Sequence, residues 1–114
     1  MQHIAFATED IVATVKRLRA NGVELLAMPE NYYDDLEART DLSSERIGVL
    51  RENNILYDRD EAGEYLQAYT RSFEDLFFFE IVERRNYLGF GAPNAPIRLA
   101  AQSRQSRHPA IPRL

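Results

Sequence analysis

The sequence contains no cysteine among its 114 residues. This absence excludes a disulfide scaffold, a thiolate metal site and a cysteine nucleophile, so any chemistry must use oxygen and nitrogen groups. No apolar run reaches the roughly 18 residues that a membrane helix needs, and the start does not follow the pattern of a signal peptide. We therefore expect a soluble cytoplasmic protein that does not bind a membrane.

Clustered positive charge is also scarce, since the formal net charge is -4. Nucleic-acid binding is not expected, because phosphate contacts need clustered Lys and Arg. One local basic group occurs near the end of the chain, and we interpret it as a solvated tail and not as a binding surface. It consists of Arg98, Arg104, Arg107 and Arg113.

The length is that of one domain, which we expect over residues 1–102, followed by a flexible tail over 103–114. Hydrophobic spacing and turn residues predict an α+β protein with the order β-α-β, a helical insertion, and three further strands. The expected strands are 3–8, 23–28, 55–57, 65–70 and 76–83. The expected helices are 10–21, one opening at 31–36, 43–53 and a short one near 97–102.

Histidine occurs only twice, as His3 at the start of the first strand and His108 in the tail. Side chains alternate across a strand, so His3 shares one face with two alanines, while Ile4 and Phe6 are expected to face the helices. A face of small residues with one polar side chain is typical of a cavity wall. A hydrogen-bonded histidine at the start of a strand fits the same pattern equally well.

Glu80 interrupts the apolar segment 77–82, which is the strongest strand pattern in the chain. An ionised carboxylate in such a strand is costly unless it is paired or binds a metal. The alternative is a strand with one partly wet face, on which Glu80 and Glu83 are solvated. His3 and Glu80 alone cannot hold a metal firmly, because first-row ions take three or more protein ligands.

Gln67 shares a strand face with Tyr65 and Tyr69. One amide and two phenols can orient a polar ligand, although a half-exposed edge strand would show the same pattern. No Gly-rich phosphate loop and no serine in a nucleophile elbow occur in the sequence.

Several segments match a known family in order and spacing. They are 2–5 (QHIA), 31–36 (NYYDDL), 55–60 (ILYDRD), 66–70 (LQAYT) and 77–84 (FFFEIVER). Over residues 1 to about 102 the chain resembles the C-terminal part of 4-hydroxyphenylpyruvate dioxygenases. The segment 94–101 (NAPIRLAA) is more similar still to the dioxygenase-like region of bacterial bifunctional proteins, which begin with a sugar-phosphate-isomerase-like barrel, often a 3-dehydroshikimate dehydratase.

The resemblance implies a βαβββ module of the vicinal-oxygen-chelate fold, half of an open barrel that two modules form around a metal. It implies iron(II) held by two His and one carboxylate, with open positions for a 2-oxo acid and dioxygen. His3 matches the second histidine and Glu80 the carboxylate, whereas the first histidine belongs to a preceding module. Manganese, cobalt, nickel or zinc could take the same ligands.

The resemblance also assigns substrate contacts. The matching positions are Gln2, Gln67, Tyr69, Phe78 and Asn94, with Asn94 as a lid over the pocket. Two phenylalanines of the family's C-terminal helix, which stack on the substrate ring, are replaced here by Ala95 and Leu99. Because this stacking is lost, hydroxyphenylpyruvate is not the expected substrate.

Three hypotheses follow from these patterns. In the first, His3 and Glu80 belong to an oxygenase site for a 2-oxo acid or another oxygen chelator, completed by the preceding module. In the second, two copies pair about a two-fold axis and bring two His and two Glu together, as in glyoxalase-type members. In the third, the domain is a non-catalytic structural or ligand-sensing module of a bifunctional 3-dehydroshikimate dehydratase. The isolated chain is not expected to hold a complete site unless it forms a dimer.

Overall fold

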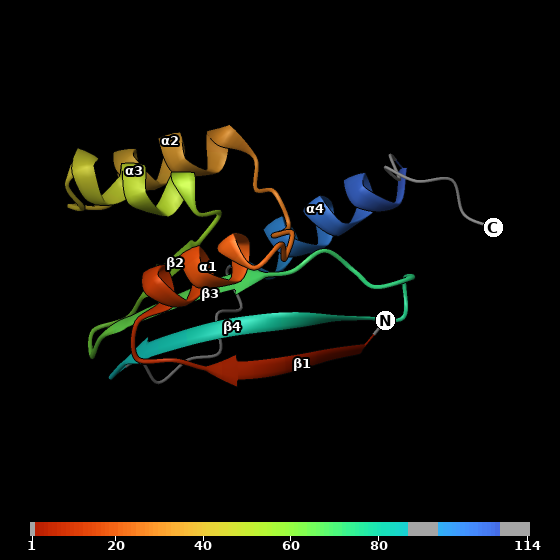
Figure 1. The fold of residues 1–114 in the computed structure, drawn as a ribbon. Helices are drawn as coiled ribbons and strands as arrows, with labels where there is room; N and C mark the ends of the chain where they lie inside the picture. Colours follow the sequence, from red (N-terminus) through yellow and green to blue (C-terminus); the bar gives the residue numbers. More distant parts are fainter. Residues whose placement is uncertain (1, 87–93, 108–114) are drawn as a thin grey trace.

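A computed structural model describes residues 2–86 and 94–107 of the chain. Within this part, four strands form one sheet in the order β1-β4-β3-β2, and four helices lie above β1 and β4 in the view of Figure 1. The strands are β1 (Gln2–Ala7), β2 (Leu56–Arg59), β3 (Glu64–Tyr69) and β4 (Phe77–Arg85). The predicted α+β class and the βαβββ half-barrel with a helical insertion are confirmed.

The first and the last strand lie side by side. β1 pairs with β4 in parallel, whereas β4–β3 and β3–β2 are antiparallel. The register aligns Ala5 with Glu80 and His3 with Phe78. Because paired residues project to the same face of a sheet, this register brings His3 and Glu80 to one face although they lie at opposite ends of the sequence.

Helix α1 (Ile11–Ala20) covers the other face of the sheet. Asp10 caps it by accepting a hydrogen bond from the Ala13 N–H, and the buried Glu83 carboxylate accepts one from the Ile11 N–H at 2.8 Å. Ile11 and Val15 are fully buried against β3 and β4. Glu83 therefore fixes the start of α1 to the sheet, and the alternative of a solvated carboxylate at this position is wrong.

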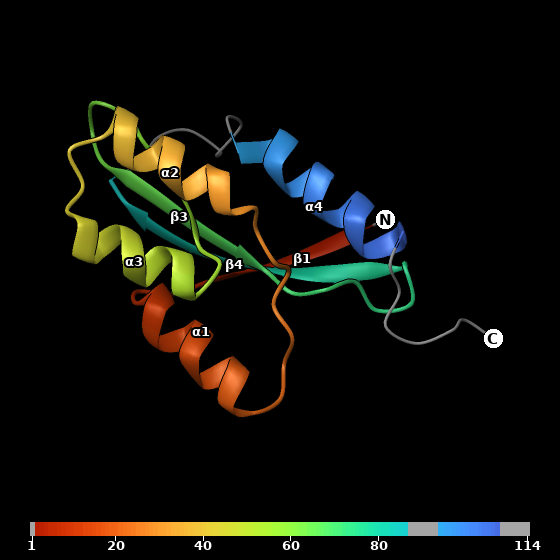
Figure 2. The same ribbon diagram turned by 90° about the horizontal axis from the view of Figure 1, so that it is seen from above.

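The helical insertion consists of α2 (Glu30–Arg39) and α3 (Ser44–Glu52), which pack together beyond the β2 edge. Ser43 caps α3 by accepting a hydrogen bond from the Arg46 N–H. Figure 2 shows α1 and α4 (Ala95–Arg107) flanking the strands. α1 packs on β3 and β4 from one face, whereas Arg98 of α4 contacts Tyr69 and Phe78 on the other face. No described helix is long and apolar enough to cross a membrane.

The strand expected at 23–28 does not form. Leu25 makes only an isolated bridge to Thr70, and the Leu26 N–H donates to the Tyr69 carbonyl at 2.7 Å. β3 already pairs with β4 and β2 on its two edges, and its ladder with β2 ends at Gln67. Only the last residues of β3 are therefore open to this segment, which explains why one bridge replaces a strand.

Two other expectations differ from the structure. Helix α4 runs to Arg107, five residues beyond the expected end at 102, so the described part of the tail region 103–107 is helical. Residues 108–114, including His108, lie outside the described residues, and their flexibility stays a prediction. Ile4 and Phe6 share the α1 side of the sheet, but they remain 48% and 52% exposed, because α1 packs over β3 and β4.

Candidate metal and substrate pocket

A pocket of about 460 Å³ lies on the sheet face opposite α1. Strands β1, β3 and β4 form its floor, and Arg98 of α4 lines the side opposite this floor. Its polar lining includes His3, Tyr65, Gln67, Tyr69, Glu80 and Arg98. A larger hollow of about 750 Å³ between residues 22–27 and α4 contains none of the predicted site residues. Strand alternation placed Gln67 and Tyr69 on one face of their strand, and the register of the sheet brings His3 and Glu80 to that same face.

His3 and Glu80 are the central pair of this pocket. The His3 Nε2 atom lies 3.5 Å from Glu80 Oε1. The imidazole of His3 stacks on the Phe78 ring, with 5.4 Å between centroids and 18° between planes. The His3 side chain is 47% exposed and that of Glu80 is 11% exposed. A buried carboxylate therefore faces an imidazole that is still accessible to a ligand or a partner.

The second oxygen of Glu80 is held by two neighbours on β3. Gln67 Nε2 donates to Glu80 Oε2 at 3.0 Å, and the Tyr69 hydroxyl donates to the same oxygen at 3.2 Å. Gln67 Nε2 also donates to the Tyr69 hydroxyl at 2.7 Å. Burial, reinforced by the charge of Glu80, raises the pKa of Tyr69 well above its usual range. Tyr69 therefore stays a neutral hydroxyl donor at physiological pH.

A further layer of hydrogen bonds supports Gln67. Asn94 Nδ2 donates to Gln67 Oε1 at 3.2 Å, and the Tyr32 hydroxyl donates to Asn94 Oδ1 at 2.9 Å. The Tyr32 oxygen also accepts a hydrogen bond from the Tyr57 N–H at 3.0 Å. Asn94 is 2% exposed, so it acts inside this network. Successive hydrogen bonds therefore connect the Glu80 carboxylate, through Gln67 and Asn94, to Tyr32 of the insertion helix α2.

The structure also separates the predicted substrate residues. Gln67 and Tyr69 line the pocket, and Phe78 supports the His3 ring on the same face. Gln2 lies on the opposite face of β1, by the alternation of that strand, and is not part of the described pocket lining. Leu99 on α4 is 56% exposed.

Two contributors escaped the sequence analysis. Tyr32 lies in a segment that the family resemblance covers, but no pattern there indicates a link to Glu80. Arg98 was grouped with the basic tail, whereas it lies on α4 and lines the pocket. The sequence signal for Arg98 is weak. Ile97 and Ala101, which flank it on the helix, are apolar residues that pack on the core. Arg98 therefore lies at the border of the packed face of α4.

The donor atoms fit a divalent metal. Two ligand atoms, each about 2.1 Å from one ion, lie roughly 3.0 Å apart at a right angle and roughly 3.4 Å apart at the tetrahedral angle. The separation of 3.5 Å between His3 Nε2 and Glu80 Oε1 is close to the second value and about 0.5 Å longer than the first, which a six-coordinate iron(II) would need. Among the described residues, no group of three or more His, Cys, Asp or Glu side chains could hold an ion. The described part of the pocket therefore offers two donor atoms, one from His3 and one from Glu80, at a spacing that suits a single ion.

Comparison with known proteins identifies the chain's relatives. A 3-dehydroshikimate dehydratase of Pseudomonas aeruginosa is 49% identical over 94% of this chain, and a 4-hydroxyphenylpyruvate dioxygenase of Tetrahymena thermophila is 46% identical over 82%. The chain is a homologue of one part of these 4-hydroxyphenylpyruvate dioxygenase-like proteins. It spans only 17% of the length of that dehydratase and 25% of the dioxygenase. No family model matches the chain.

Solved structures agree with this dioxygenase-like domain. A xylose isomerase-like TIM barrel/4-hydroxyphenylpyruvate dioxygenase fusion protein superposes with a TM-score of 0.86 at 48% identity, over 90% of this chain and 17% of that chain. A mutant of 4-hydroxymandelate synthase from Streptomyces coelicolor superposes with a TM-score of 0.82 at 39% identity, over 92% of this chain and 30% of the other. The vicinal-oxygen-chelate fold expected from the resemblance is confirmed.

Proposed function

We propose that His3 and Glu80 bind a divalent metal, iron(II) in the native protein, as part of an oxygenase site for a 2-oxo acid. The observation that carries this proposal is the approach of His3 Nε2 to Glu80 Oε1 at 3.5 Å inside a pocket. One imidazole and one carboxylate are two of the three ligands in non-haem iron(II) oxygenases. The relation to proteins named as dioxygenases supports a metal cofactor.

Each residue has a distinct part in this proposal. His3 and Glu80 are the ligands, and Gln67 with Tyr69 orients the carboxylate through its other oxygen. Such hydrogen bonds behind a ligand fix its direction and raise metal affinity. Phe78 holds the plane of the imidazole by stacking. When bound, iron(II) supplies open coordination positions for the substrate and dioxygen.

The two remaining predicted substrate contacts, Asn94 and Gln2, are supported to different degrees. Asn94 acts through Gln67, since its amide donates to that side chain at 3.2 Å. Gln2 stays a proposed substrate contact that rests on the family resemblance alone. Gln2 lies on the face of β1 that points away from the pocket. It would contact the substrate only if β1 changed its position or if a neighbouring module placed the substrate on that face.

The third ligand is proposed to come from a preceding module of a longer protein. The chain spans about a sixth to a quarter of the relatives' length, which leaves room for such a module. A second copy of the chain is the alternative source, because β1 is an edge of the described sheet and carries His3. In either arrangement the accessible side of His3 faces the missing partner.

A non-catalytic role is the second candidate function. The observation that favours it is the incomplete ligand set within the described residues. In that case the pocket would bind a metal or a small acid for sensing, without turnover. Oxygen consumption by the longer natural protein with a series of 2-oxo acids distinguishes the two functions, since only the oxygenase consumes dioxygen.

Isothermal titration of the purified chain with Co(II) and Mn(II) tests the metal site. We expect one weak site that His3→Ala and Glu80→Gln each abolish. Glu37→Gln is the matched control, because it removes the same charge at an exposed position of α2. Binding that survives both site variants would show that the metal is held elsewhere. Light scattering with and without Co(II) reports whether a second copy completes the site.

A further inference from the structure

Positive charge gathers in the pocket around Glu80, although the chain as a whole is negative. Arg84 and Arg98 line this pocket with a single carboxylate, that of Glu80, whereas the formal net charge of the chain is -4. A divalent metal on His3 and Glu80 would add further positive charge. A concave site with this balance attracts anionic ligands.

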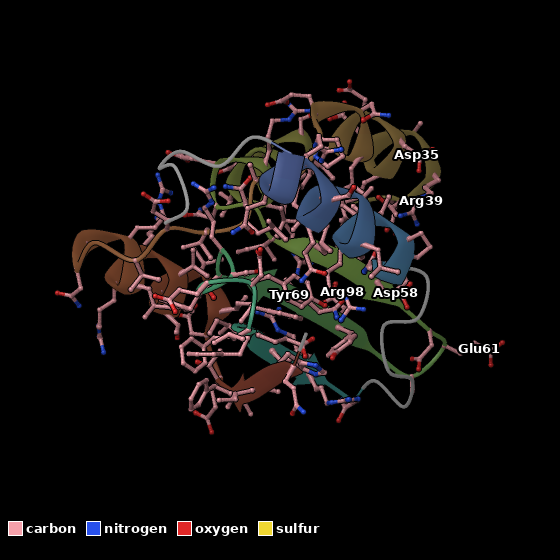
Figure 3. All side chains as sticks on the ribbon, turned by 90° about the vertical axis from the view of Figure 1, so that its right-hand side faces the viewer. Asp35, Arg39, Asp58, Glu61, Tyr69 and Arg98 are labelled. Carbon is pink, nitrogen blue, oxygen red and sulfur yellow. The ribbon has the colours of Figure 1, made fainter. Side chains whose placement is uncertain are left out.

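Arg98 is held by aromatic rings. Figure 3 shows Arg98 beside Tyr69, in the space between α4 and the sheet. The guanidinium carbon lies 5.9 Å from the centroid of the Tyr69 ring and 5.8 Å from that of Phe78. Such cation–π contacts orient a guanidinium through its face and leave its N–H edge for hydrogen bonds.

One donor of the Arg98 guanidinium, the Nε–H group, has no acceptor among the described residues. Within residues 2–86 and 94–107, Arg98 Nε is buried and has no hydrogen-bond partner. A buried donor without an acceptor is unfavourable, and it becomes favourable when a ligand supplies the acceptor. The arginine is therefore placed as the binding group for an anion that enters the pocket.

The neighbouring charged groups already have other contacts. Glu80 Oε2 accepts from Gln67 and Tyr69, and its Oε1 faces His3. The Arg84 guanidinium carbon lies 4.6 Å from the centroid of the Tyr65 ring, whereas Arg98 lies over Tyr69 and Phe78. Glu80 is the only carboxylate among the described lining residues, and no second one is available for Arg98 there.

We propose that Arg98 binds a second carboxylate of the substrate, so that the pocket takes a 2-oxo diacid and not a 2-oxo acid with a neutral tail. This inference rests on the proposed function, because the first carboxylate and the oxo group are assigned to the metal. The guanidinium fork matches a carboxylate through two parallel hydrogen bonds. A pocket of about 460 Å³ holds a small diacid.

The C-terminal helix supports the same substrate class. The family resemblance predicts aromatic clamping at two positions of this helix, which are Ala95 and Leu99 in this chain. Arg98 stands between them on α4 and lines the pocket. The helix therefore offers a cation in place of stacking rings, which favours a charged substrate tail over an aryl tail.

Titration of the Co(II)-loaded chain with 2-oxoadipate and 2-oxohexanoate tests the proposal, because the two acids have the same number of carbon atoms. We expect the diacid to bind about tenfold more tightly or better, as charge-assisted hydrogen bonds do. Arg98→Gln should remove this preference without weakening Co(II) binding, because the variant removes a positive charge from the pocket. Arg98→Lys should keep part of it, since the charge remains without the fork. Arg17→Gln, an exposed change on α1, is the matched control.

A second measurement does not depend on the metal. Adipate is titrated into the metal-free chain, and the Arg98 Nε–H resonance, assigned with Arg98→Gln, is followed by NMR. A saturable shift supports the anion site even if Co(II) does not bind, in which case only the proposed metal site fails. No shift, equal affinity of the two oxo acids for the Co(II)-loaded chain, or a preference that survives Arg98→Gln would each overturn the proposal.

Discussion

Replacing Tyr69 by Phe tests whether the hydrogen bonds around Glu80 serve a metal site. Tyr69 is 3% exposed, and its hydroxyl accepts from Gln67 Nε2 at 2.7 Å and donates to Glu80 Oε2 at 3.2 Å. One buried hydrogen bond contributes about 0.5–1.5 kcal/mol, so the loss of two costs about 1–3 kcal/mol. Gln67 keeps its own bond to Glu80 at 3.0 Å, so we expect the lower part of that range, about 1–2 kcal/mol.

The same substitution should weaken metal binding. With one donor fewer on Oε2, the Glu80 carboxylate is less firmly oriented toward His3. Loss of such a supporting contact lowers metal affinity by about tenfold to a hundredfold, and we expect about tenfold because Gln67 remains. Isothermal titration with Co(II) measures the affinity. Urea unfolding measures the stability, and its midpoint should fall by about 0.5–1 M.

Tyr33→Phe is the matched control for this prediction. The Tyr33 hydroxyl is also buried, and it donates to the Ile55 carbonyl at 3.0 Å, outside the pocket. This variant should lose about 0.5–1.5 kcal/mol of stability and keep its Co(II) affinity. If both variants weaken Co(II) binding equally, the effect comes from general destabilisation. If Tyr69→Phe leaves the affinity unchanged, the supporting role of Tyr69 is refuted.

The other predictions concern the fold. Burial, with the Glu64 carboxylate beside it, raises the pKa of Tyr57 to about 12 from an ordinary 10.0. Between about pH 10 and 12 the folded chain keeps the Tyr57 proton, whereas the unfolded chain has released it. The free energy of unfolding should therefore fall as the pH rises through this range, by at most about 1.4 kcal/mol per pH unit for this group. In urea unfolding at a series of alkaline pH values, Tyr57→Phe should make the fall shallower, and an unchanged slope would contradict the assignment. Gly63→Ala would place a Cβ 1.6 Å from the Arg85 carbonyl oxygen, so thermal unfolding should show a loss of about 2 kcal/mol or more. Gly48→Ala on α3 meets nothing within 4 Å and should gain about 0.5–1 kcal/mol; equal behaviour of the two variants would disprove the steric argument.

Strand periodicity was sufficient to orient the main candidate residues. A period of two places His3 on one side of its strand and Glu80 on one side of another, whatever the rest of the fold does. It could not show that these strands are neighbours. That fact depends on the parallel pairing of β1 with β4 and on the alignment of Ala5 with Glu80. Only the family resemblance anticipated this arrangement.

Pairing capacity explains the main failure of the strand prediction. Residues 23–28 have an apolar pattern typical of a strand, but pattern alone does not show whether a partner edge is free. β3 uses both edges for β2 and β4, and only the bridge of Leu25 to Thr70 remains. Competition for an edge is a property of the whole sheet, so a local segment does not record it.

By itself, the sequence determined the α+β class, the absence of thiol chemistry, and the shared face of His3 and its neighbours on the first strand. These follow from composition and from short-range alternation, which the backbone geometry imposes. The tertiary structure alone decided the distance of 3.5 Å from His3 to Glu80, the links from Glu80 to Gln67 and Asn94, and the position of Arg98 over the pocket. Each of these joins elements that are distant in the chain, and their contacts depend on how the helices pack on the completed sheet.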